Sequence, residues 1–204
     1  RSAPWNFSGR AGQPLWRYRQ TCTTCQGPSP VVQGEIVLAT KNSGYHTGDT
    51  DAVRIDYADG VFSTHVLWTK QGFGDLYTTL VVDGDSVYGT SGGRLYCLDL
   101  ATGEERWRSP DGVGFKSVIL ADHFLLGQNS RTLVLAEASP LGYHELARSQ
   151  LPQYYWADNS PSFGNGRIYM RRDGVLSCLA VSPPSVRVGA TLLPGTDEVR
   201  LTIA

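Results

Sequence analysis

A strand–turn–strand pattern around Thr102-Gly103 constrains this 204-residue chain more than any other feature. Residues 94–98 carry side chains that favour strands, and the glycine of the turn tolerates a positive φ at little steric cost. Residues 105–108 then return antiparallel, with Trp107 placed four positions after the glycine. The pattern predicts a β-hairpin with a large aromatic anchor on its second strand.

The same pattern recurs along the chain at regular intervals. The position of Asp99 is matched by Asp56 upstream and by Glu137 and Ala180 downstream, at spacings of 43, 38 and 43 residues. A pair of short strands joined by a tight turn precedes each copy, at 29–37, 79–88, 117–125 and 160–169. A period near 40 residues is typical of the four-stranded blades of a β-propeller. The alternative is a meandering β-sandwich with similar hairpins.

Composition supports an all-β protein. The 23 glycines and 11 prolines divide the chain into short β-rich segments, and apolar residues almost nowhere recur at helical spacing. The one place where a helix competes is 141–149. The net charge of −1 argues against nucleic acid or an anionic membrane as a partner, and no run of eighteen apolar residues predicts a transmembrane segment.

The residues of the best hairpin carry a family resemblance. The pattern formed by Cys97, Asp99, Thr102, Gly103 and Trp107 resembles the tryptophan-docking repeat of pyrroloquinoline-quinone-type β-propellers. The resemblance covers about residues 5–181. It implies that the Trp of each blade packs against the neighbouring blade and that the Thr-Gly turn fixes the outer hairpin.

Measured against this repeat, Ala11-Gly12 fits the turn and Trp16 the anchor. We therefore expect the chain to begin in the middle of a blade, without the two inner strands of that blade. Three blades follow at 27–68, 72–109 and 113–149, and another starts near Tyr154. In the first of these, Asp59-Gly60 is the turn and Trp68 the anchor, with four inserted residues between them.

We therefore expect a partial propeller of about four blades, the first incomplete, over residues 1–181. An open arc of blades leaves the sheet faces at its two ends exposed to water. We therefore expect this arc to be about half of a seven- or eight-bladed ring, completed by residues outside this sequence or by another chain. Residues 182–204 form a tail with two further strands, at 185–193 and 198–203, which either complete the last blade or start an appended module. The competing arrangement is a closed ring of four or five blades with these tail strands at the seam.

Few residues suggest chemistry. Cys22 and Cys25 form a C-x-x-C pair that predicts a local disulfide or plain thiols, with a metal site and redox catalysis as alternatives. Cys97 and Cys178 occupy one repeat position and are expected to be buried packing residues.

Two groups of candidate binding residues remain. A cation could be held by His46, Asp49 and Asp51, although a solvated turn-rich loop explains them as well. A ligand at the mouth of the channel could meet Tyr154, Tyr155, Trp156 and, on the following hairpin, Arg171.

The expected function is a non-catalytic binding or scaffold propeller with protein partners, no cofactor and no catalytic residue. The repeat also resembles that of the propeller lipoprotein of outer-membrane assembly machinery. This resemblance implies that the protein is located in the periplasm or cell envelope. The alternatives are a fragment of a quinone-dependent dehydrogenase and a subunit that contributes half a ring to a larger complex. Family dehydrogenases have a vicinal Cys-Cys pair by resemblance, and this sequence has none. Fold alone does not decide among these functions.

Overall fold

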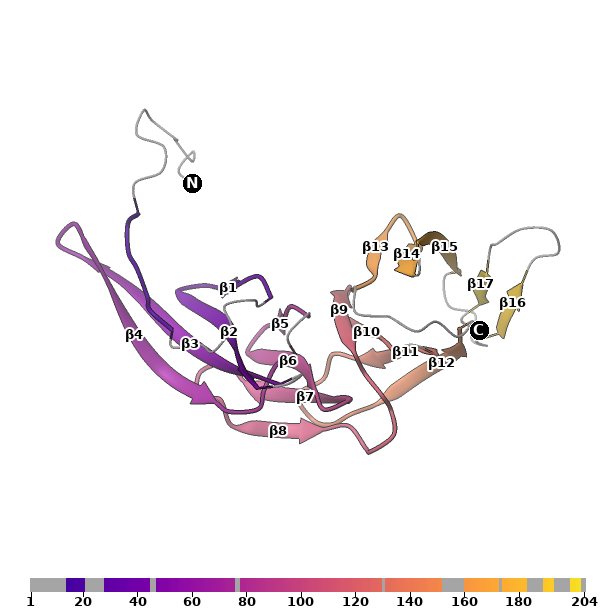
Figure 1. Cartoon of the computed structure of the whole chain (residues 1–204), viewed down its shortest axis with the longest axis horizontal. Coiled ribbons are helices and arrows are strands. Elements are labelled where there is room, and N and C mark those ends of the chain that lie inside the picture. The colour runs from indigo at the N-terminus through magenta and orange to yellow at the C-terminus, as the bar shows by residue number, and fades with distance from the viewer. Residues whose placement is uncertain are drawn as a thin grey trace, which may run out of the picture.

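The computed structural model describes residues 14–20, 28–44, 47–75, 78–129, 131–151, 160–172, 174–182, 189–192 and 199–202. Within these ranges the chain forms strands and no helix, which confirms the all-β prediction. The segment where a helix competed contains a strand, β12, instead. Four sheets follow one another along an open arc, with the first and last sheets at opposite ends (Figure 1). The fold is that of a partial propeller.

Each of the first three sheets is one antiparallel blade with its strands in sequence order. Blade 1 consists of β1 (Val31–Gln33), β2 (Ile36–Gly44), β3 (Thr47–Ala58) and β4 (Val61–Lys70). Blade 2 consists of β5 (Val81–Asp83), β6 (Ser86–Ser91), β7 (Arg94–Asp99) and β8 (Glu105–Arg108). Blade 3 consists of β9 (Ser117–Ala121), β10 (Phe124–Gln128), β11 (Thr132–Glu137) and β12 (Glu145–Gln150). The predicted ends of these blades agree with the sheets within two residues, and the predicted starts precede the first strands by four to nine residues.

The last sheet, blade 4, departs from this pattern. It contains β13 (Ser162–Gly164), β14 (Arg167–Arg172) and β15 (Val175–Ser182), followed by β17 (Val199–Thr202) and β16 (Gly189–Leu192). β17 pairs with β15 in parallel, so the tail takes the place of an antiparallel fourth strand. The sequence explains the difference, because Pro183-Pro184 follows β15 where the other blades have a turn, and this repeat lacks both the Asp and the Trp. The described tail residues therefore join the last sheet, and the division of the chain at 181/182 stays a prediction.

The hydrophobic core lies between the blades, in three clusters. The cluster between blades 1 and 2 includes Leu38, Ala52 and Trp68 packed on Leu80, Val87, Leu98 and Leu100. The cluster between blades 2 and 3 contains Tyr88, Leu95, Cys97, Trp107, Val113, Phe115, Val118, Leu125, Val134 and Ala136. The cluster between blades 3 and 4 contains Leu126, Leu133, Leu151, Ile168, Met170 and Leu179. Because each blade buries its faces on its neighbours, the stability of one blade depends on the blade beside it.

Candidate functional site

Trp68 joins blade 1 to blade 2. Its indole Nε1–H donates to the carbonyl oxygen of Leu100 at 2.9 Å, in a buried position. The ring lies against Gly103, whose φ is 71°. A Cβ atom at Gly103 would come within 2.5 Å of the Trp68 ring, so only glycine fits at this turn. The insertion before Trp68 thus leaves the docking contact in place.

Trp107 makes the corresponding contact between blades 2 and 3. Its Nε1–H donates to the carbonyl oxygen of Ser139 at 2.8 Å, and its ring lies 5.9 Å from Tyr88 and 6.0 Å from Tyr143, centroid to centroid. Donor and acceptor are 32 residues apart for both tryptophans, so successive blades dock in the same way. Trp16, in the described segment 14–20, keeps 37% of its surface exposed.

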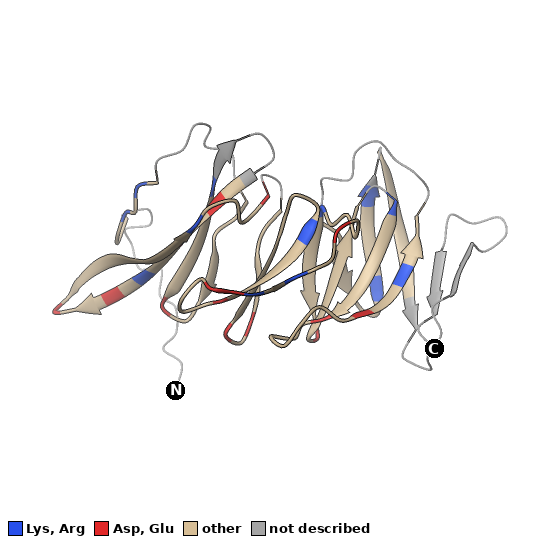
Figure 2. Ribbon diagram, turned by 90° about the horizontal axis from the view of Figure 1, so that it is seen from below, with Lys and Arg blue, Asp and Glu red and all other residues tan. Residues whose placement is uncertain are grey.

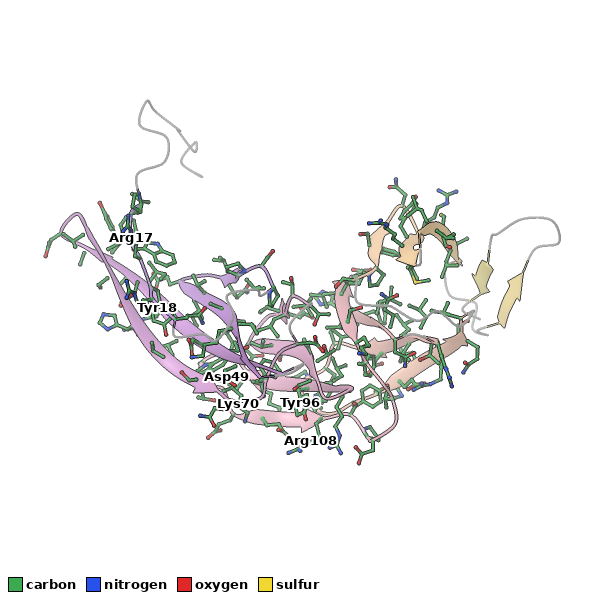
Figure 3. All side chains as sticks on the ribbon, in the orientation of Figure 1. Arg17, Tyr18, Asp49, Lys70, Tyr96 and Arg108 are labelled. Carbon is green, nitrogen blue, oxygen red and sulfur yellow. The ribbon has the colours of Figure 1, made fainter. Side chains whose placement is uncertain are left out.

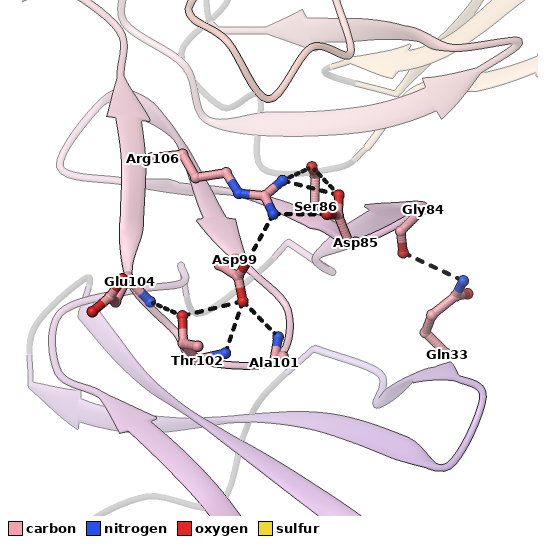
Figure 4. A network of polar contacts seen from close by, with 9 residues as sticks. All are labelled: Gln33, Gly84, Asp85, Ser86, Asp99, Ala101, Thr102, Glu104 and Arg106. Atoms are coloured by element: carbon pink, nitrogen blue, oxygen red, sulfur yellow. Dashed lines mark hydrogen bonds and ion pairs between the residues drawn. The ribbon is translucent and has the colours of Figure 1, made fainter.

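The acidic residue of the repeat organises the outer hairpin of blade 2 (Figure 4). Asp99 Oδ1 accepts hydrogen bonds from the backbone N–H groups of Ala101 and Thr102, both at 2.9 Å, and from the Thr102 hydroxyl at 3.1 Å. Its other oxygen accepts from Arg106 at 2.7 Å. The backbone N–H of Thr102 and the Arg106 guanidinium hold the pKa of Asp99 below its usual range. This carboxylate therefore closes the turn that presents Gly103 to Trp68.

Arg106 ties that turn to the inner hairpin of the same blade. Its guanidinium forms two hydrogen bonds to Asp85, both at 2.9 Å, and one to the Ser86 hydroxyl at 2.6 Å. Hydrogen bonds from Arg106 lower the pKa of Asp85 to about 2. The cluster lies at the surface, so we assign it a geometric role with little net stabilisation.

The segment 14–20 is fastened to blade 1 by a buried carboxylate. Asp51 of β3 accepts hydrogen bonds from Gln20 at 2.8 Å, from the Thr69 hydroxyl at 2.8 Å and from the Tyr18 hydroxyl at 3.1 Å. The ammonium group of Lys41 lies 3.4 Å away. Figure 3 shows Tyr18 beside the strands of blade 1. We call this group the Asp51 clasp.

Two of the three residues considered as cation ligands already have protein partners. Both oxygens of Asp51 already accept from protein donors, and Asp49 accepts a hydrogen bond from the backbone N–H of Gly72 at 2.9 Å. His46 lies outside the described residues. Over the ranges that the structure describes, no three His, Cys, Asp or Glu side chains are grouped to hold a metal ion. Asp49 and Asp51 lie on strand β3 and not in the solvated loop that the sequence suggested, and their hydrogen bonds stay within blade 1, the turn that follows it and the segment 14–20.

The clasp predicts an acid-sensitive segment. Burial alone would raise the pKa of Asp51, but hydrogen bonds from Gln20 and Thr69 and the charge of Lys41 lower it overall. A lowered pKa in the folded state contributes stability above the unfolded value, about 4, and this contribution is lost as the pH falls through the folded value. We expect Asp51→Asn to lower the free energy of unfolding by about 1–2 kcal/mol at pH 7.

Urea denaturation at pH 7 and below pH 4 measures this effect, with Asp49→Asn as the matched control on the same strand. The difference between Asp51→Asn and the wild type should shrink as the pH falls. A difference that is the same at both pH values would contradict the assignment.

Blade 4 repeats blade 2 at an offset of 81 residues. In blade 2, Tyr88 pairs with Cys97 and Thr90 with Leu95; in blade 4, Tyr169 pairs with Cys178 and Arg171 with Leu176. The blade 2 side chains face blade 3 and are buried. The side of blade 4 that corresponds to them carries Tyr169, Arg171, Leu176 and Cys178, which we call the open face.

The open face is uncovered over the described residues. Leu176 is 73% exposed where Leu95 is 0%, and Tyr169 is 37% exposed where Tyr88 is 0%. Arg171 is exposed, whereas Thr90 is buried and donates to the carbonyl oxygen of Lys116 at 3.3 Å in blade 3. Exposed apolar surfaces are typical of sites where proteins bind one another.

The cysteines differ in the same way. Cys97 is buried, and burial raises the pKa of its thiol to about 11; Cys178 is half-buried, and both are free thiols. Cys178 is thus more exposed than the sequence predicts, because no described blade covers its side of the sheet. Cys22, Cys25, Tyr154, Tyr155 and Trp156 lie outside the described residues, so their predicted roles stay predictions.

Sequence reasoning singled out Arg171 but missed its neighbours Tyr169 and Leu176. The 81-residue offset between β6–β7 and β14–β15 is the signal that could have found them. Sequence reasoning also missed the Asp51 clasp, because the clasp depends on a contact between segments more than 30 residues apart.

Comparison with known proteins agrees with this architecture. Residues 3–136 match the model of a PQQ-repeat family described as outer membrane protein assembly factor BamB. The chain belongs to this family. No curated protein matches the sequence.

A solved structure supports the BamB-type fold. BamB from Moraxella catarrhalis is 13% identical, with a TM-score of 0.53, over 72% of this chain and 46% of that one. At this identity the likeness concerns the fold alone. The chain thus spans about half the length of the BamB structure it matches.

Over the described residues, no helix is long and apolar enough to cross a bilayer.

Proposed function

We propose that this BamB-type chain is a non-catalytic scaffold module that forms part of a larger propeller and binds proteins in an envelope complex. The observation that carries the proposal is the open face of blade 4. Its positions correspond to those that blade 3 covers on blade 2, and they still carry Tyr169, Leu176 and Cys178. A blade of the same repeat is the partner that fits such a face, because it supplies the apolar side chains that cover Leu95 and Tyr88.

The family and the length of the chain support the rest of the proposal. A family described as an outer-membrane assembly factor favours protein partners and a periplasmic or envelope location. A chain that spans about half of a BamB structure is consistent with a propeller completed by further blades. The hydrogen bonds of Asp51 and Asp99 support a structural role for these two carboxylates, because Asp51 is enclosed by donors and Asp99 closes a turn.

Cys178 is a direct probe of this proposal. The native protein would be purified from its own cells without denaturation, and the 204-residue chain would be prepared separately. Both would be treated with N-ethylmaleimide, and each cysteine would be mapped by mass spectrometry. We expect Cys178 to react in the 204-residue chain and to be protected in the native protein, whereas buried Cys97 is protected in both and serves as the internal control.

Equal labelling of Cys178 in the two samples would overturn the proposed covering blade. The non-catalytic part of the proposal is tested separately, by adding pyrroloquinoline quinone and calcium to the native protein and measuring dye-linked alcohol oxidation. Turnover in that assay would favour the dehydrogenase alternative. Fractionation of the same cells tests the location, which the proposal places in the envelope.

A further inference from the structure

The outer edge strand of blade 1 differs from those of blades 2 and 3. β8 has four residues, three of them charged, and β12 has six residues that include Glu145 and Arg148. On both strands the charges are held by ion pairs, at 2.7 Å in each case. Short, charged edges of this kind prevent a sheet from pairing with another chain. β4 has ten residues, and Lys70, its last, is the only Asp, Glu, Lys or Arg among them.

The four-residue insertion lengthens this edge into an arm. β3 and β4 continue past the rest of blade 1 to a tight turn at Asp59-Gly60, where φ is 52° and 80° (Figure 1). The same arm projects from the end of the row of sheets in Figure 2. Two positive φ angles are typical of a two-residue hairpin turn that keeps both strands in register to the tip.

The two faces of the arm differ in polarity. On one face the rings of Tyr57 and Phe62 lie 4.6 Å apart, centroid to centroid, and Val66 is 49% exposed. On the other face Asp56 is 3.0 Å from Arg54 and 3.4 Å from His65. The side chains of β4 that share the apolar face are Phe62, Thr64 and Val66, at alternating positions.

The backbone pattern shows which groups of β4 are free to pair. The N–H of Ile55 donates to the carbonyl oxygen of Glu35 at 2.8 Å, so the polar backbone groups of Ile55 point toward β2. Those of Asp56 then point toward β4, where Asp56 pairs with Ser63. Thr64, the next residue, directs its N–H and C=O away from β3. Within the described part of the chain, β4 has no strand on that side.

We propose that β4 pairs with β4 of a second copy of this chain, antiparallel and centred on Thr64. In an antiparallel pair, a residue whose N–H and C=O point toward the partner strand lies opposite a residue of the same kind. Thr64 of one copy therefore lies opposite Thr64 of the other, and Phe62 lies opposite Val66. Thr–Thr and aromatic–β-branched pairs are among those that stabilise antiparallel sheets. The two blades then form one eight-stranded sheet about a two-fold axis.

A second copy fits this edge because the edge is complementary to itself. In the two-fold register Ser63 faces His65, and no acidic or basic side chain among residues 62–66 meets a like charge. A two-fold antiparallel pair of β8 with β8, or of β12 with β12, would bring like charges close together. The proposal concerns the outer edge of blade 1 and does not rest on the proposed function, which concerns the open face of blade 4.

Analytical ultracentrifugation of the 204-residue chain from about 1 to 500 µM tests the proposal. We expect the weight-average mass to rise from 22.3 kDa toward that of a dimer. Thr64→Pro removes an outward N–H that β3 does not use, so the fold should persist while the chain stays monomeric. Ser63→Pro, the adjacent control, removes an N–H of the β3–β4 ladder and should lower the urea midpoint instead.

A second variant keeps the test valid if proline perturbs the strand. Thr64→Lys places two like charges opposite each other and should raise the dissociation constant about tenfold or more. Leu176→Lys, on the open face, should leave dimerisation unchanged. A wild-type monomer at every concentration would overturn the proposal, as would association that survives both Thr64 variants.

Discussion

Trp107→Ala is expected to lower the free energy of unfolding by about 3–5 kcal/mol, the range for removing a large aromatic side chain from a core. The ring is 9% exposed and is packed between Tyr88 of blade 2 and Tyr143 of blade 3. Its removal leaves a cavity between two blades and deprives the Ser139 carbonyl of a donor. Because neighbouring blades stabilise each other across such interfaces, the loss should also uncouple them.

Urea denaturation followed by circular dichroism measures both effects. We expect a lower midpoint and a broader transition, because blades 1 and 2 no longer unfold together with blades 3 and 4. Trp107→Phe, which keeps a ring but loses the hydrogen bond, should cost less. Trp16→Ala, at a partly exposed position, should change the free energy of unfolding by less than about 1 kcal/mol. A Trp107→Ala protein with a transition as sharp and as stable as the wild type would contradict the role assigned to this docking contact.

Much of the propeller could be predicted because its signals are local. A turn glycine, an acidic residue four positions before it and a tryptophan four positions after it all lie within one hairpin. In blade 2 they become the Asp99 turn and the Trp107 dock. The insertion before Trp68 did not hide the repeat, because Asp59-Gly60 still forms a tight turn and Trp68 still reaches Leu100. Regular spacing then predicted the order of the described sheets, and the incomplete blade expected before them falls mostly on residues 1–13, outside the described residues.

Features that depend on distant parts of the chain could not be predicted. Asp51 resembled a loop cation ligand in sequence, yet its partners Tyr18 and Gln20 come from a segment about 30 residues earlier. The parallel pairing of β17 with β15 has no counterpart in the other blades, and nothing in the alternation of the tail residues indicates a direction. The exposure of Cys178 depends on what lies beside its sheet, which its own sequence position does not specify.

Leu95→Ala and Leu176→Ala form the second large prediction, because the two leucines occupy one repeat position in different surroundings. Leu95 is 0% exposed in the core between blades 2 and 3, and its truncation should cost about 2–5 kcal/mol. Leu176 is 73% exposed, so its truncation in the 204-residue chain should change the free energy of unfolding by no more than about 0.5 kcal/mol. Urea midpoints of the two variants, prepared in parallel, measure the difference.

The same pair of variants separates an open arc from a closed ring. In an arc that ends at blade 4, only Leu95→Ala is costly in the 204-residue chain. In a closed ring of four or five blades, Leu176 would be covered, and both variants would lose comparable stability. If a further blade covers the open face in the native protein, we expect Leu176→Ala to be as destabilising there as Leu95→Ala, because Leu176 then lies between two sheets. A small cost for Leu176→Ala in both the chain and the native protein would leave the open face without a covering blade and contradict the proposed assembly.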